Sequence, residues 1–349
     1  MSEASNETGA NCPLPHTGGT EVTLAHGGGG RLMQRLIEDV FVAAFGREAL
    51  HDGAIIEDCT RRTVTTTDAF VVKPRRFPGG DIGALAVNGT VNDLAMCGAR
   101  PLALTAAFIL EEGLSLDELR VVARSMAAAA RAVNVAIVTG DTKVVERGYG
   151  DGVYIITTGV GALDHDIDIH PRAIRHGDVL IINGDVARHG MAVMCAREGI
   201  STEPAIVSDQ QPLWAAVLAL IEADIAVHCL RDPTRGGLAT TACELAAASG
   251  LAFELDEASL SVSPEVESAC DLFGLDPLYV ANEGRFVAVV AAPDADRAVE
   301  ILRAIPGCEG ATRCGSVKAD ADGRVRLRTR LGTFRHVMML SGAQLPRIC

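Results

Sequence analysis

The chain has 349 residues, 48% of them apolar, and 31 Lys and Arg against 45 Asp and Glu give a formal net charge of −14. This length predicts two domains with sizeable cores. The negative charge argues against a nucleic-acid or anionic membrane surface, because both attract basic proteins. No apolar run reaches the roughly 18 residues of a membrane span, and residues 1–20 lack the basic start and apolar stretch of a signal peptide.

Ten cysteines are scattered along the chain, and no two of them form a C-x-x-C pair. The chain is too long for a small scaffold held by disulfides, and a structural zinc site is not expected without paired spacing. Several of the cysteines fall in apolar helical patterns and are expected to be buried small side chains. We therefore expect reduced cysteines and a cytoplasmic setting.

The first half of the chain alternates between strand and helix patterns. Residues 1–20, rich in Gly, Asn, Thr and Ser, predict a disordered tail. Residues 21–25 predict a strand that leads into the loop His26-Gly27-Gly28-Gly29-Gly30 and then a helix. Further strands are predicted over 64–72, 101–110, 135–139 and 153–163. Helices are predicted over 81–98 and over 115–133, the second with a capping box at its start.

A second unit begins near Pro171 and alternates in the same way. We expect strands over 178–182, over 286–291 and, as strand–turn–strand, over 317–327. Helices are expected from about His189, over 214–221, over 238–247 and over 294–304. Alternation in both halves indicates α/β or α+β layers. We predict an N-terminal domain over 21–165, a C-terminal domain over 171–330 and a flexible tail over 331–349 that carries the final cysteine.

The helix predicted over 81–98 has a narrow polar stripe among apolar residues. Asp81, Asn88 and Asn92 stand at positions i, i+7 and i+11 and so share one face, with Asp93 beside them. Such residues also occur on solvated helices, but the other positions are too apolar for an ordinary solvated face. We therefore predict a mostly buried helix whose polar groups are satisfied by partners.

Further acidic residues lie in or just after predicted strands. Asp68 follows Thr66-Thr67, and Asp141, Thr142 and Lys143 follow the strand over 135–139. Carboxylates at strand ends are typical supports for hard cations that bind phosphates, although each one alone is more often a turn or cap residue. Together, four carboxylates predict a magnesium ion that bridges a triphosphate: Asp68, Asp81, Asp93 and Asp141.

Three loops add candidate contacts, although the chain has neither a Walker P-loop nor a G-x-G-x-x-G motif with a plausible acidic partner. The glycine loop around Gly28 and Gly29 can approach phosphate oxygens closely, or it is a flexible linker. Asp232-Pro233-Thr234-Arg235-Gly236-Gly237 opens a helix whose amides, with Arg235, can meet an anion, or it is only a well-capped start. Glu283 precedes a strand and is either a base or a surface turn residue.

The last residue is a cysteine, Cys349, which follows Pro346-Arg347-Ile348. Few structural roles need a cysteine at a chain end, because termini fray and pack little. Chance is the plain alternative. A thiol at a free end can, however, be modified in one active site and carried into another.

These motifs resemble the hydrogenase maturation factor HypE family, a member of the aminoimidazole ribonucleotide synthetase-like (PurM-like) ATP-binding superfamily. The resemblance runs in order from Glu21 to Cys349 and includes the glycine loop and the terminal Pro-Arg-Ile-Cys. It rests also on the segments 66–68, 80–83, 88–94, 140–145 and 232–237. It implies a two-domain α/β (α+β) fold, a homodimer built through the N-terminal domains, and an ATP site with Mg²⁺.

The resemblance also implies a reaction. The carbamoyltransferase HypF places a carbamoyl group on the Cys349 thiol, ATP drives dehydration to a thiocyanate, and the cyano group passes to iron on the HypC–HypD scaffold. Cys349 is then the carrier, with Lys143 and Glu283 as candidates for charge neutralisation and proton removal. The nucleotide contacts carried over by motif are Gly28, Gly29, Asp68, Asp81, Asn88, Asn92, Asp93, Asp141, Thr142, Asp232 and Arg235.

Other readings remain open. Selenophosphate synthetase shares this plan but needs a reactive cysteine or selenocysteine with a lysine nearby; Cys12 is present, yet the first lysine is Lys73. Aminoimidazole ribonucleotide synthetase and thiamine monophosphate kinase need no terminal cysteine. A non-catalytic scaffold that only presents Cys349 is the alternative from another class, and the intact carboxylates and Lys143 argue against it.

Overall fold

The computed structural model describes residues 30–36, 38, 54–57, 62–320 and 323–340. The predictions for residues 1–20, for the strand over 21–25, and for Gly28, Gly29 and Cys349 therefore lie outside the described residues. Within the described part, no helix is both long enough and apolar enough to cross a bilayer.

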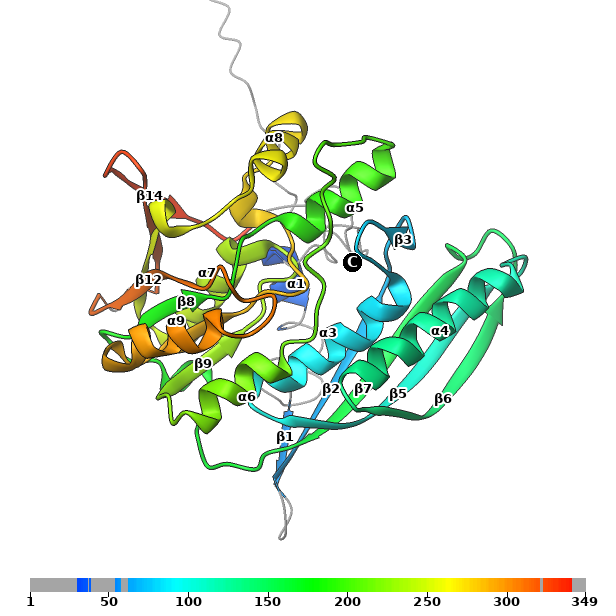
Figure 1. Ribbon diagram of the computed structural model, residues 1–349, viewed down its shortest axis with the longest axis horizontal. Helices are drawn as coiled ribbons and strands as arrows, with labels where there is room; N and C mark the ends of the chain where they lie inside the picture. Colours follow the sequence, from blue (N-terminus) through cyan, green and yellow to red (C-terminus); the bar gives the residue numbers. More distant parts are fainter. Residues whose placement is uncertain (1–29, 37, 39–53, 58–61, 321–322, 341–349) are drawn as a thin grey trace, which may run out of the picture.

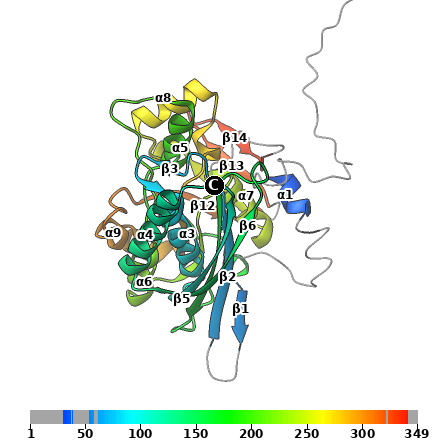
Figure 2. The same cartoon turned by 90° about the vertical axis from the view of Figure 1, so that its right-hand side faces the viewer.

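The first half forms a five-stranded sheet with two helices on one face (Figures 1 and 2). The strand order is β1-β2-β7-β5-β6, and only β5 and β6 run parallel. The strands are β1 (Ala54–Glu57), β2 (Arg62–Phe70), β5 (Arg100–Glu111), β6 (Ala136–Val145) and β7 (Val153–Ala162). The helices α3 (Ile82–Met96) and α4 (Leu116–Ala132) cover it, and the short pair β3 (Arg76–Phe77) and β4 (Gly80–Asp81) precedes α3.

The second half is built on a seven-stranded mixed sheet of order β14-β13-β10-β12-β8-β11-β9. Its strands are β8 (Val179–Ile182), β9 (Val227–Arg231), β10 (Ala252–Asp256), β11 (Val287–Val290), β12 (Thr312–Lys318), β13 (Val325–Arg328) and β14 (Phe334–Val337). The helices are α5 (Arg188–Glu198), α6 (Trp214–Glu222), α7 (Gly237–Ser249), α8 (Pro264–Phe273) and α9 (Ala295–Arg303). Short 3₁₀ turns η3 (Pro171–Ala173), η4 (Glu257–Ser259), η5 (Pro277–Tyr279) and η6 (Ala292–Asp294) connect them.

Helices cover both faces of this second sheet, which explains why β8 and β11 are continuously apolar. Leu180 and Ile182 of β8 pack in one core with α7, whereas Ile181 between them packs in another core with α6 and α9. Successive side chains of a strand point to opposite faces, so each face receives its own apolar set. The layered α/β architecture predicted from the sequence is confirmed.

The C-terminal region differs from the sequence expectation in two places. Within the segment predicted as an unpatterned tail, β14 pairs antiparallel with β13, and Val337 is buried in the core. Gly332, at φ +79°, sits in the tight turn of this hairpin rather than interrupting a tail. The strands expected on either side of residues 322–323 exist, but β10 lies between them, pairing parallel with β13 and antiparallel with β12.

Helix α3 lies between the two sheets (Figure 1), and nearly all of its residues are buried, which confirms the sequence prediction. On one side it is tied to β7: the Thr90 and Thr157 hydroxyls are 2.5 Å apart, and the Thr157 hydroxyl donates to Ala86 O at 3.0 Å. Gly159 allows the close approach, since a Cβ there would lie 2.9 Å from the Thr90 side chain. This contact fixes α3 on its sheet.

We expect Thr157→Val to lower the free energy of unfolding by about 1–3 kcal/mol, because it leaves a buried polar group of α3 without a partner. Urea unfolding measures this. The matched control is Thr158→Val on the opposite face of the same strand, where the hydroxyl pairs with Thr67 in an exposed position. Equal losses in both variants would contradict the anchoring role of Thr157.

Candidate functional site

Asp81 sits at the N-terminus of α3 and caps it. Its Oδ1 accepts hydrogen bonds from the amides of Gly83 at 2.8 Å and Ala84 at 3.0 Å. A carboxylate at this position satisfies orphan amides and interacts favourably with the helix dipole. One carboxylate oxygen of this predicted metal ligand is therefore engaged in holding the helix start.

Asp68 and Asp93 lie where α3 meets β2. The Thr66 hydroxyl donates to Asp93 Oδ2 at 2.8 Å. Asp68 follows two residues later and thus points to the same face of β2. Gly89 of α3 lies against this strand: a Cβ there would lie 2.8 Å from the Phe70 ring and 3.9 Å from Asp68 Oδ2. The structure therefore brings these two predicted metal ligands to the same helix–strand contact.

Asp141, Thr142 and Lys143 lie on β6, an edge strand whose side chains are exposed along almost its whole length. Lys143 Nζ is 3.0 Å from Asp141 Oδ2, and the Thr142 amide donates to Asp141 Oδ1 at 2.8 Å. The hydrogen bond from Lys143, and then that from the Thr142 amide, lower the pKa of Asp141. The lysine is 73% exposed, so its ammonium group can move to meet a ligand.

The four predicted metal ligands do not form one cluster in the chain. Asp68 pairs with Thr157, which pairs with Ala106, and the next residue of β5 pairs with Asp141. These steps cross three strand spacings, or about 14 Å. Asp81 and Asp93 are separated by the length of α3, about 18 Å. Accordingly, no group of three or more His, Cys, Asp or Glu side chains in the described part is placed to hold a metal.

Asn92 connects α3 to the second half of the chain. Its Nδ2 donates to Gln211 O at 3.1 Å and to Glu283 O at 3.3 Å, and its Oδ1 accepts from the Leu213 amide at 2.8 Å. Asn88, one turn earlier, is 7% exposed, and the structure records no hydrogen bond from its side chain to another described residue. Asn92 therefore serves the interface, and a contact between the Asn88 amide and a ligand stays a prediction.

Glu283 is 5% exposed and lies in a loop (residues 282–285) that is held from several sides. Asn282 Nδ2 donates to Pro233 O at 2.9 Å, and its Oδ1 accepts from the Ala187 amide at 2.8 Å. These contacts place Glu283 between α3 and the segment 232–237. Glu283 is therefore not a surface turn residue, one of the two alternatives from the sequence. It is a buried residue in a fixed loop, and its role as a base stays a prediction.

Asp209 holds the same loop through its backbone amides. The sequence analysis did not predict this contact. Its fully buried carboxylate accepts from the Gly284 amide at 3.2 Å and lies 3.8 Å from Arg285 Nε. Burial raises the pKa of Asp209. A Cβ on Gly284 would lie 1.8 Å from Asp209 O, so only glycine fits there. The string Asn-Glu-Gly-Arg was visible in the sequence, but its partner Asp209 is more than 70 residues away.

The segment 232–237 leads into α7 beside this loop. Asp232 is buried and Arg235 is exposed. Gly236 and Gly237 have φ values of +79° and +62°, a backbone conformation that side chains disfavour. The first amides of α7 are not capped by a side chain at Gly236. The anion-binding role of these amides and of Arg235 stays a prediction.

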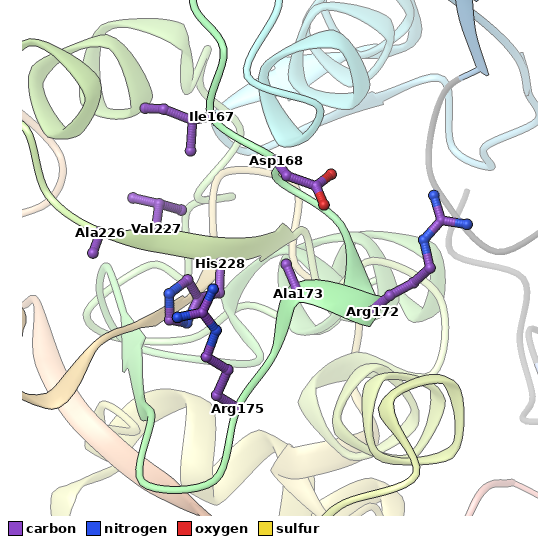
Figure 3. A pocket seen from close by; sticks show the side chains of 8 residues that line it. All are labelled: Ile167, Asp168, Arg172, Ala173, Arg175, Ala226, Val227 and His228. Carbon is purple, nitrogen blue, oxygen red and sulfur yellow. The ribbon is translucent and has the colours of Figure 1, made fainter.

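A pocket of about 570 Å³ lies elsewhere, between residues 167–175 and β9 (Figure 3). It contains none of the predicted site residues, and the charged ends of Asp168 and Arg172 point away from Arg175 and His228. His228 Nδ1 bonds the buried Asp178 carboxylate at 2.7 Å, and that oxygen also accepts from the Arg175 amide. We assign these contacts to the packing of the segment 167–178, which connects the two halves of the chain, rather than to the functional site.

Comparisons with known proteins identify the family of the chain. The chain matches the family descriptions "AIR synthase related protein, N-terminal domain" over residues 50–163 and "AIR synthase related protein, C-terminal domain" over residues 175–328. The two matches in this order define an AIR synthase-related protein of two domains, as predicted.

More specific relatives are also found. The chain is 49% identical over 332 residues to carbamoyl dehydratase HypE of Cupriavidus necator, covering 94% of this chain and 95% of the relative. It superposes on HypE of a HypE–HypF complex with TM-score 0.83 at 43% identity (87% and 99% covered), and on HypE in complex with ATP with TM-score 0.81 at 43% identity (94% and 100% covered). The chain belongs to the carbamoyl dehydratase HypE family of hydrogenase maturation enzymes, so the family prediction is confirmed.

We expect Asn92→Leu to destabilise the protein by about 2–4 kcal/mol, because three hydrogen bonds between the two halves are lost and their buried partners stay unsatisfied. Thermal or urea unfolding measures this. Asn88→Leu is the matched control on the same helix face, and we expect it to change stability by less than about 1 kcal/mol. The reverse order of the two variants would contradict the interface role of Asn92.

Proposed function

We propose that the chain is an ATP-dependent carbamoyl dehydratase that converts an S-carbamoyl group on its own Cys349 into a thiocyanate, the donor of the cyanide ligand for nickel–iron hydrogenase assembly. Membership of the HypE family and the solved HypE complex with ATP support this proposal. The observation that carries it is structural: the Arg31 amide, next to the glycine loop, donates to Leu340 O at 3.0 Å. The nine residues that follow Leu340 thus start beside Gly30 and Arg31, which follow the predicted contacts Gly28 and Gly29 in the sequence.

The length of this segment suits the reaction. Nine extended residues span up to about 30 Å. We propose that this length lets Cys349 bring a carbamoyl group to the nucleotide and also leave it. A carrier that visits a partner enzyme requires this freedom.

The chemistry defines the tasks of the other residues. A carbamoyl oxygen is a poor leaving group, so the γ-phosphoryl group of ATP is first transferred to it. Phosphate then leaves with that oxygen, and the nitrogen gives up both of its protons as S–C≡N forms. Phosphoryl transfer needs positioning and charge neutralisation, which suits the mobile Lys143 ammonium. Proton removal needs a base at a fixed position, which suits Glu283 in its rigid loop.

The magnesium prediction fits part of the carboxylate set. Mg²⁺ commonly takes one or two carboxylates and completes its shell with phosphate oxygens and water. Asp68 and Asp93, at the contact between α3 and β2, have this chemistry, and Asp81 and Asp141 lie further away. When bound, the ion would neutralise phosphate charge. Asn88, Thr142, Asp232, Arg235, Gly28 and Gly29 complete the proposed nucleotide contacts.

The proposed partners follow from the same reaction. A carbamoyl donor must reach the terminal thiol, and HypF is proposed for this step because a solved HypE–HypF complex contains a protein 43% identical to this chain. An iron acceptor must take the cyano group, for which we propose the HypC–HypD complex. Both steps are placed in the cytoplasm, where thiols stay reduced.

A homodimer through β6 is also proposed. This edge strand exposes Ile137, Val138 and Val144, the last two at 62% and 68%, along with its outer row of backbone groups. An exposed apolar edge strand is a ready template for pairing with another chain. A second copy at this edge would cover these side chains and approach Asp141 and Lys143.

We expect Val138→Lys to shift the protein from dimer to monomer in sedimentation velocity, because it places a charge in the centre of the proposed edge contact. The control is Leu272→Lys on α8, which replaces a side chain of similar exposure, 65%, far from β6. A wild-type protein that sediments as a monomer, or a variant that stays dimeric, would refute this interface.

The proposed reaction is tested by mass spectrometry of the C-terminal peptide after incubation with HypF, carbamoyl phosphate and ATP. We expect a carbamoyl adduct on Cys349 that then loses one water and yields the thiocyanate. An adduct that never loses water, with ATP present, would leave only the role of a passive carrier.

The matched variant is Cys349→Ala. We expect unchanged melting temperature and ATP binding, since the substitution affects only the last residue, together with complete loss of cyanide transfer. Hydrogenase maturation in cells that contain only this variant would show that another group carries the carbamoyl.

A further inference from the structure

We propose that residues 337–340, called the root segment here, are a fixed base for the terminal residues, and that Tyr279 is a positioning residue that holds this base. Only residues 341–349 then act as the carrier arm. This inference rests on the proposed function, because it concerns how the thiol is delivered.

Three carbonyl groups of the root segment are each bound by a donor from a different element. Cys243 Sγ of α7 lies 3.5 Å from Val337 O, Tyr279 Oη of η5 donates to Met338 O at 2.9 Å, and the Arg31 amide of α1 (Arg31–Leu36) donates to Leu340 O at 3.0 Å. The thiol is a weak donor, so the tyrosine and the amide are the stronger contacts. Carbonyls bound in this way cannot swing with the residues that follow them.

Packing supports the same conclusion. Val337 is 4% exposed in the core beneath the sheet, and Cys243 and Tyr279 pack against that core. Burial raises the pKa of Cys243 to about 11 and also raises the pKa of Tyr279, so both groups keep their protons at neutral pH and remain donors. Gly30 closes the contact, since a Cβ there would lie 2.4 Å from Leu340 O. Figure 2 shows α1 beside the β14 end of the sheet.

The position of this base determines the length of the arm. An arm that began after Arg330 would have 19 residues, whereas an arm that begins after Leu340 has nine. Effective concentration falls roughly as the −3/2 power of length, so the shorter arm raises that of the thiol at its targets about threefold. The arm also pivots beside the glycine loop instead of at the distant turn between β13 and β14.

A length-rescue experiment on the full-length protein tests this. HypF and carbamoyl phosphate first form the Cys349 adduct, and its loss of water is then followed in a single turnover at saturating ATP. Deletion of residues 342–344 shortens the reach of the arm from about 30 Å to about 20 Å. We expect dehydration to slow at least about tenfold, because the mispositioning of reacting groups is costly.

Two insertions into the deletion variant then discriminate. Three glycines after Ser341 lie within the arm and should restore the rate. Three glycines after Leu331, in the exposed turn between β13 and β14, lie before the root segment and should restore nothing. Equal rescue by both insertions, or a deletion without effect, would overturn the proposal.

Tyr279→Phe removes the hydroxyl and keeps the ring. We expect the Arg31 amide to exchange with solvent about two- to tenfold faster, the range that one lost hydrogen bond permits. We also expect the three glycines after Leu331 to begin to rescue the deletion variant. The KM for ATP should stay unchanged. Tyr149→Phe, at a 78% exposed ring, is the control and should change neither. Exchange of the Arg31 amide needs neither ATP nor product, so it tests the root segment even if the wild-type adduct loses no water. Unchanged exchange in Tyr279→Phe would overturn the positioning role.

Discussion

The side-chain amide of Asn92 is the interaction on which the arrangement of the candidate site depends. It joins a helix of the first half to the backbone of residues 211, 213 and 283 in the second half. A buried amide costs several kcal/mol unless its groups find partners. The arrangement of the two halves that supplies all three partners of Asn92 is therefore favoured. In this arrangement the backbone of Glu283 lies beside Asn92 on the polar face of α3. Asp68 and Asp93 lie on the sheet side of the same helix, so one buried element sets the relative positions of residues from both halves.

The residues divide into a rigid set and a mobile set, and the division matches the chemistry. Glu283 is held by Asn282, Asp209 and Asn92, all of them buried and hydrogen-bonded. Lys143 and Asp141 are exposed on an edge strand. In the proposed reaction the substrate is attached to the chain end, and such an enzyme gains most from a fixed base, since proton transfer depends on short distances. A charge that meets phosphate can move with the nucleotide, because electrostatic neutralisation depends less steeply on distance.

Local patterns in the sequence predicted most elements, but not their neighbours in space. The period of apolar residues identified α3, β5, β7 and β8, and the cap at Ser115 identified α4. Three features depended on contacts between distant residues and were not predictable in this way. These were the pairing of β14 with β13, the position of β10 between β12 and β13, and the support of Glu283 by Asp209. The motif string placed Asp68 and Asp141 in one predicted metal site, yet β7 and β5 separate their strands.

Two features of β6, its exposed apolar side chains and its exposed acid–lysine pair, together support the proposed dimer. The strand leaves apolar side chains and a row of backbone groups uncovered, and it carries the acid–lysine pair, three strand spacings from Asp68 across the sheet. Either feature alone has an ordinary explanation: edge strands are often exposed, and carboxylates often stay solvated. A second copy at this edge would remedy both at once. It would bury the apolar surface and bring the charged pair of one chain toward a neighbouring site, so assembly and catalysis would depend on the same strand.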